Sequence, residues 1–179
     1  MLRSFAAGLA LLSAGLLFPA APAAADPEES FLRTVSGQWV GPGEIVAGKY
    51  KGTRFTCTLA GDTTPGSDLG IALDGSCRVG LFAQPMSAKV SRRNGRFSGS
   101  FLDGAEGSGL DITSGVLQGD RMVFALGRKQ LNGAMVARLD GSDSLAVTVS
   151  VRVGTELVPV IGMNLQRSGP AVRRSALAN

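Results

Sequence analysis

Residues 145–153 read LAVTVSVRV, and their order decides the class of fold. Leucine or valine occupies every second position from Leu145 to Val153, and small or polar side chains stand between them. Because successive side chains of a β-strand point to opposite faces of a sheet, this order places one apolar face against a core and one face in water. A helix would mix the two sets around its circumference. The stretch is therefore predicted to be a half-buried strand.

The same alternation recurs along the chain. Shorter segments with this period lie at residues 54–59, 86–90, 97–101, 110–113, 121–126, 134–139 and 160–167. Asn94-Gly95 stands between two of them and suits the positive φ angles of a two-residue type I′ hairpin turn. Regular turn signals between short strands are typical of a barrel or a sandwich. We expect an all-β fold, a single antiparallel up-and-down barrel of roughly eight to ten strands, with no amphipathic helix after the leader.

The ends of the chain predict its compartment. Residues 1–25 have a basic start, an apolar run and small residues before Asp26, as in an export signal. A membrane anchor is the alternative, but Pro19 and Pro22 interrupt the run before it reaches the roughly 20 apolar residues that a span needs. We expect a protein without a transmembrane segment, located in the periplasm of a Gram-negative bacterium or outside the cell. The predicted parts are a signal peptide (1–25), an N-terminal arm (26–33), a β-barrel domain (34–168) and a flexible tail (169–179).

The amino-acid composition excludes several classes of catalytic and metal-binding site. The chain has no histidine, which excludes Ser-His-Asp catalysis and histidine metal sites. Its carboxylates mostly adjoin glycine or serine, where turn capping explains them; a carboxylate-based hydrolase is the alternative. The basic residues are scattered, unlike the stripe of a nucleic-acid binder. Arg92, Arg93 and Arg96 form the densest cluster, which we expect to keep a hairpin tip soluble, with an anionic head group or glycan as the alternative. We expect no enzyme, no cofactor, no metal and no nucleic-acid partner.

The two cysteines, Cys57 and Cys77, lie on neighbouring predicted strands. Exported chains meet oxidising conditions, so a disulfide bond is the first interpretation. A zinc site is the alternative, but two thiolates without histidine make a poor cage. The bond would stabilise the fold by roughly 3 kcal/mol in the chain-entropy treatment.

The single tryptophan, Trp39, stands on the first predicted strand. An up-and-down barrel pairs its first strand with its last, and one end of it must be sealed against water. A large ring from the first strand serves this purpose, and an arginine over its face adds about 0.5–2 kcal/mol of cation–π attraction. Arg167, at the end of the last predicted strand, is the candidate.

Gly37, Gln38 and Trp39 resemble the Gly-x-Trp signature of lipocalins and related calycins. The resemblance implies an antiparallel barrel whose base is closed by the tryptophan, with an arginine from the final strand packed on it. By position this arginine would be Arg167, so the resemblance assigns Gly37, Trp39 and Arg167 as barrel-closing residues.

The SGQW stretch at residues 36–39 also resembles the start of bacterial periplasmic inhibitors of secreted metalloproteases. Those proteins are small exported barrels with one disulfide bond between early strands, which Cys57 and Cys77 would match. In that family a flexible N-terminal trunk enters the protease cleft. The resemblance implies that DPEESFLR, residues 26–33, would play this part.

One set of apolar side chains is predicted to face the interior of the barrel and to be the candidate lining of a ligand site. It comprises Phe55, Leu59, Ile71, Leu73, Val90, Phe97, Phe101, Val149 and Met163. These residues would line either a packed core or an apolar cup, because both require the same alternation. We expect a non-enzymatic exported binding protein whose barrel holds a small hydrophobic ligand or lipid in the cell envelope. The alternative is a protein-binding module, such as an inhibitor of an exported protease or an envelope scaffold.

Overall fold

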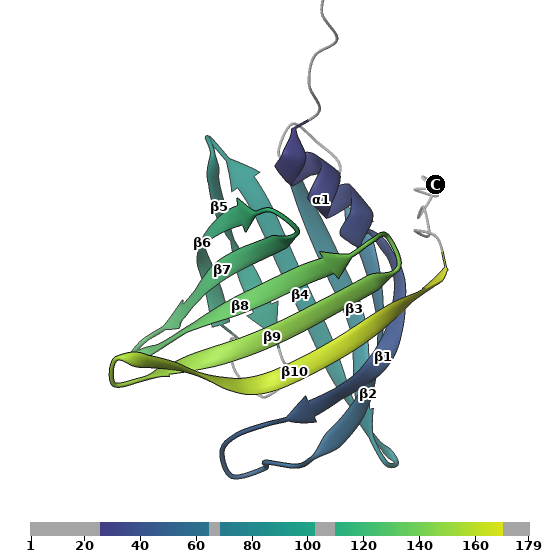
Figure 1. The fold of residues 1–179 in the computed structure, drawn as a ribbon, viewed down its shortest axis with the longest axis vertical. Coiled ribbons are helices and arrows are strands. Elements are labelled where there is room, and N and C mark those ends of the chain that lie inside the picture. Colours follow the sequence, from purple (N-terminus) through teal and green to yellow (C-terminus); the bar gives the residue numbers. More distant parts are fainter. Residues whose placement is uncertain (1–25, 65–68, 103–109, 170–179) are drawn as a thin grey trace, which may run out of the picture.

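The computed structural model describes residues 26–64, 69–102 and 110–169, which form one closed antiparallel barrel and one helix (Figure 1). The elements are α1 (Pro27–Val35), β1 (Gly37–Ile45), β2 (Arg54–Thr63), β3 (Leu69–Val79), β4 (Phe82–Arg93), β5 (Arg96–Leu102), β6 (Leu110–Gln118), β7 (Arg121–Arg128), β8 (Leu131–Asp140), β9 (Ser144–Val153) and β10 (Glu156–Gly169). The predicted single up-and-down barrel is confirmed, with ten strands. Within the described ranges, no helix is long and apolar enough to cross a bilayer. The predicted signal peptide (1–25) and residues 170–179 of the predicted tail (169–179) lie outside the described residues, whereas Gly169 is the last residue of β10.

The barrel closes because β1 pairs with β10 as well as with β2. Trp39 is the register partner of Arg167 in this seam, and Ile45 is the partner of Ile161. The predicted pairing of the first strand with the last is therefore confirmed. Closure gives each of the ten strands two hydrogen-bonded neighbours, which removes the free edges that an open sheet would expose.

The segments with a period of two form strands with one buried side. In β9, Leu145, Val147 and Val149 are buried. Asn94 and Gly95 join β4 to β5 with φ angles of 51° and 74°, as the predicted type I′ turn requires.

Helix α1 corrects the sequence analysis, which predicted an arm at residues 26–33 and no helix after the leader. Phe31, Leu32 and Val35 are buried by the barrel, and the helix lies at one end of it (Figure 1). A helix of nine residues is marginal in isolation, so the packing of this apolar face stabilises it.

The two cysteines are cross-strand partners. Cys57 of β2 pairs directly with Cys77 of β3, and a disulfide bond joins them with a Cα–Cα distance of 4.0 Å. Both are buried, and the sulfur of Cys57 lies 3.7 Å from the sulfur of Met163 on β10. The predicted pairing is confirmed, and the bond lies within the core.

Candidate functional site

Helix α1 is held to the barrel at its first turn. The Asp26 carboxylate caps the helix by accepting a hydrogen bond from the Glu28 amide at 2.9 Å. Arg92, near the end of β4, forms ion pairs with the carboxylates of both Asp26 and Glu28. The hydrogen bond from Arg92 is the largest cause that holds the pKa of Asp26 below its ordinary value, and the same contacts raise the pKa of Arg92. Sequence reasoning placed Arg92 at a soluble hairpin tip and missed this contact.

The last turn of α1 is fixed to the β1–β10 seam. A helix end leaves four carbonyl groups without helical partners, and here these belong to residues 32–35. The amide and the hydroxyl of Ser36 donate hydrogen bonds to the first two. The Arg167 guanidinium donates to the third, and the indole N–H of Trp39 donates to the fourth at 2.7 Å. All four groups are therefore satisfied by residues that directly follow the helix or lie in the seam.

The predicted barrel-closing residues converge at this point. The Trp39 side chain is 0% exposed, and Cζ of Arg167 lies 4.4 Å from the centroid of its ring. Arg167 also donates hydrogen bonds to the carbonyl oxygens of Ser36 at 2.8 Å and of Ser142 at 2.9 Å. Gly37 makes room for the guanidinium, because a Cβ there would lie 2.2 Å from Nη1 of Arg167 and its φ is +134°. The set fastens α1 to the barrel.

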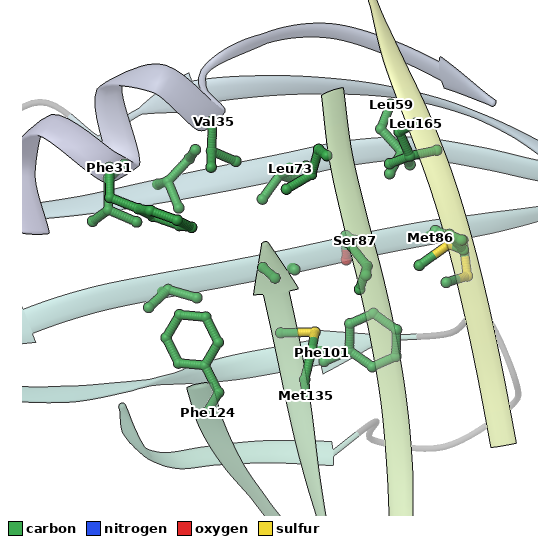
Figure 2. Close-up of a pocket in the computed structure, with 18 residues that line it drawn as sticks. Phe31, Val35, Leu59, Leu73, Met86, Ser87, Phe101, Phe124, Met135 and Leu165 are labelled. Atoms are coloured by element: carbon green, nitrogen blue, oxygen red, sulfur yellow. The ribbon is translucent and has the colours of Figure 1, made fainter. Parts of the chain in front are cut away.

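A cavity of about 80 Å³ lies in the barrel beneath α1 (Figure 2). Phe31, Leu32 and Val35 of α1 form one wall, and side chains from β2, β3, β4, β5, β7, β8, β9 and β10 form the rest. Among the lining residues that the structure describes, only Ser87 has a polar side chain. Figure 2 shows Phe31 and Val35 on the helix side, with Phe124 on the opposite strands.

Most of the predicted interior residues face this cavity. Six of the nine line it, namely Leu59, Ile71, Leu73, Val90, Phe101 and Met163. The other three, Phe55, Phe97 and Val149, pack elsewhere in the barrel interior. Sequence reasoning missed the three side chains from α1, because it assigned this segment to an arm.

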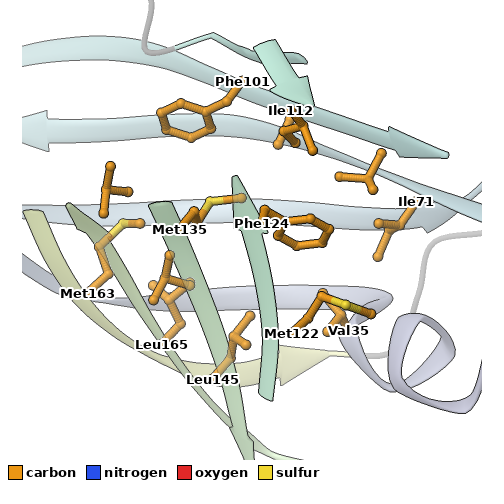
Figure 3. Close-up of a cluster of buried hydrophobic side chains, with 14 of the residues drawn as sticks. Val35, Ile71, Phe101, Ile112, Met122, Phe124, Met135, Leu145, Met163 and Leu165 are labelled. Atoms are coloured by element: carbon orange, nitrogen blue, oxygen red, sulfur yellow. The ribbon is translucent and has the colours of Figure 1, made fainter. Parts of the chain in front are cut away.

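Three methionines, Met86, Met135 and Met163, also line the cavity. Figure 3 shows Met122, Met135 and Met163 directed into the cluster of buried side chains. Ligand pockets usually have volumes of about 300–1,000 Å³, so a cavity of about 80 Å³ is small for a ligand. Methionine is unbranched and flexible, and it adapts to irregular spaces. Met86, Met135 and Met163 are therefore the most adaptable side chains of the wall.

The described lining of the cavity is almost entirely apolar. The part of the chain that the structure describes has no buried polar or charged side chain, and it has no cluster of three or more His, Cys, Asp or Glu residues that could hold a metal. A polar group brought into such a space would lose its hydrogen bonds to water without replacement. Among the described residues, Ser87 alone contributes a polar side chain to this apolar lining.

The fold has a counterpart among solved structures. The crystal structure of Rv2717c from M. tuberculosis aligns with 79% of this chain and 98% of that chain, with a TM-score of 0.55 and 17% sequence identity. At this identity the likeness shows a common fold alone. No protein-family model and no curated protein matches the sequence. The lipocalin and protease-inhibitor resemblances thus rest on the few residues that carry them.

Proposed function

We propose that this chain is a non-enzymatic exported carrier whose barrel holds a slender apolar ligand, such as one acyl chain of a lipid. The observation that carries the proposal is the cavity beneath α1, whose described lining is apolar except for Ser87. A buried apolar ligand gains roughly 0.8 kcal/mol for each CH₂ group removed from water, so a short hydrocarbon segment suffices for measurable binding.

Helix α1 is the element that would admit the ligand. It contributes three lining side chains, yet polar contacts at its two ends account for much of its attachment. Release of the Arg92 ion pairs would free the first turn while Trp39 and Arg167 still hold the last turn. The protease-inhibitor alternative receives less support, because the segment that would enter a protease cleft is helical and buries Phe31 and Leu32.

The experiment compares two substitutions that each introduce a phenylalanine ring. Ala137→Phe places a ring into the cavity, whereas Val116→Phe places one on an exposed position of β6. The mature protein is stripped of lipid, and binding of a fluorescent polyene fatty acid is titrated; native mass spectrometry of protein from the cell envelope tests for a bound lipid.

We expect one fatty acid per barrel in the unsubstituted protein and in Val116→Phe, and at least tenfold weaker binding in Ala137→Phe. Thermal unfolding of each variant checks that the barrel remains folded. The proposal fails if the unsubstituted protein neither binds the probe nor retains a lipid, or if Ala137→Phe binds as well as Val116→Phe.

A further inference from the structure

Exposed apolar side chains gather at the end of the barrel opposite α1. We define the mouth as residues 44–54, 78–82, 128–131 and 152–157, which contain the β1–β2, β3–β4, β7–β8 and β9–β10 connections. In an up-and-down barrel these alternate connections fall at one end, and α1 precedes β1 at the other. Of the ten large apolar side chains that are exposed in the described ranges, eight belong to the mouth. They are Val46, Tyr50, Val79, Leu81, Phe82, Leu131, Val153 and Leu157.

The exposure of these side chains is large. Leu81 is 94% exposed and Phe82 is 83% exposed at the turn of the β3–β4 hairpin, and Tyr50 in the β1–β2 connection is 62% exposed. Single exposed apolar residues are common, but a group at one end of a monomer marks an interaction surface. Figure 1 shows the β1–β2 connection projecting from the end of the barrel away from α1.

The charge of the mouth indicates the kind of partner. The mouth as defined leaves out the β5–β6 connection, whose sequence includes the acidic Asp103 and Glu106, and it has seven basic and two acidic residues. The basic residues are Lys49, Lys51, Arg54, Arg78, Arg128, Lys129 and Arg152, and the acidic residues are Glu44 and Glu156. The Glu44 carboxylate lies 3.7 Å from Nε of Arg54 and so neutralises the charge of this arginine.

The opposite end differs in both respects. Several of its arginines pair with carboxylates, as Arg92 does with Asp26 and Arg138 with Asp120. None of the exposed large apolar side chains of the described residues belongs to α1 or to the hairpin turns beside it. The excess of positive charge and the exposed apolar side chains therefore coincide at the mouth.

We infer that the mouth docks on the surface of a bilayer that contains anionic lipids. Apolar tips such as Leu81 and Phe82 would enter the boundary between head groups and acyl chains, and Tyr50 would lie at head-group level. The surrounding lysine and arginine side chains would bind lipid phosphates, and each adds to the attraction toward an anionic surface. Neither step depends on whether the cavity holds a ligand.

Flotation of the mature protein with vesicles tests the inference. The vesicles are of phosphatidylcholine alone and of phosphatidylcholine with about one third phosphatidylglycerol, at low and at raised salt. The apolar variant is Leu81→Ser with Phe82→Ser, and the charge variant is Lys49→Gln with Lys51→Gln. Val116→Ser and Arg121→Gln, which lie outside the mouth, are the matched controls. All these positions are exposed, so the barrel should fold in each variant.

We expect the unsubstituted protein and both controls to float with the anionic vesicles and to be released by salt. The apolar variant and the charge variant should each bind at least tenfold more weakly. Equal binding by variants and controls, or no flotation of the unsubstituted protein, would overturn the inference. The inference would also be overturned if the unsubstituted protein were a dimer in solution and the apolar variant were a monomer, because the mouth would then bind a second copy of the chain. Ala137→Phe should float normally, so failure of the carrier proposal is distinguishable from failure of this one.

Discussion

The contact between Trp39 and Arg167 gives the sharpest test of how the barrel is closed. We consider Trp39→Ala, Arg167→Ala and the double variant. Trp39 is fully buried, and its replacement removes a large ring and the donor to the last helical carbonyl. Removal of a buried aromatic side chain typically costs about 3–5 kcal/mol, so we expect a loss in this range.

Arg167→Ala should cost less. The guanidinium donates hydrogen bonds to the carbonyl oxygens of Thr34, Ser36 and Ser142, and each such bond contributes roughly 1 kcal/mol net. Its packing on the indole adds about 1 kcal/mol, because this part of the side chain is only partly in water. The bond to Ser142 is exposed to water and adds little, so we expect a loss of about 3 kcal/mol, at the lower end of the range for Trp39→Ala.

The free energies of unfolding are measured by urea titration of the oxidised protein that comprises residues 26–179. The double variant should lose about 1 kcal/mol less than the sum of the two single variants, because the cation–π contact can be lost only once. Additivity within about 0.5 kcal/mol would refute the coupling. A loss well below about 3 kcal/mol for Trp39→Ala would refute the account of the ring as the seal of the barrel.

The other predictions concern the fastening of α1 and the disulfide bond. Gly37→Ala should lower the free energy of unfolding by about 1–3 kcal/mol, because a Cβ at φ +134° meets Nη1 of Arg167, whereas Gly162→Ala, with nothing near its Cβ, should be almost neutral by the same titration. Reduction of the disulfide bond should cost roughly 3 kcal/mol and lower the melting temperature, and an unchanged melting temperature would contradict this. Because the pKa of Asp26 is lowered in the folded protein, its contribution is present above pH 3.8 and is lost as the pH falls through the lower folded value. Hydrogen exchange in α1 should therefore accelerate as the pH is lowered below 3.8, relative to the β-strand amides. Arg92→Ala should weaken this pH dependence without removing it, because the backbone hydrogen bonds from Glu28 and Glu29 also lower the pKa of Asp26.

Much of the barrel could be predicted because its signals are local. The alternation of LAVTVSVRV and the positive φ angles of Asn94 and Gly95 depend on residues that are adjacent in the sequence. The contact of Trp39 with Arg167 was also predicted, because a closed barrel obliges the first strand to meet the last.

Helix α1 was not predicted, although its boundaries carry helix signals. Asp26 is an N-cap, Pro27 stands in the first turn and Arg33 in the last. The helix has only nine residues, and its apolar face consists of three side chains, which is too few to show a clear helical period. The cavity was not predictable either, because the same inward residues serve a filled interior and a hollow one. Which of the two forms depends on how far the strands stand apart and on how α1 packs, and these are tertiary properties.

The seam between β1 and β10 has a consequence for how the molecule is made. Trp39 and Arg167 come from opposite ends of the folded chain, so the register that joins them requires nearly the whole polypeptide. A nascent chain that lacks its final strand has two unpaired sheet edges and no cation to cover the indole. Contacts between such distant residues form slowly, because the loop entropy is lost before the contact is gained. During refolding, burial of the Trp39 indole should therefore report the pairing of β1 with β10, which we expect to follow the formation of the local hairpins.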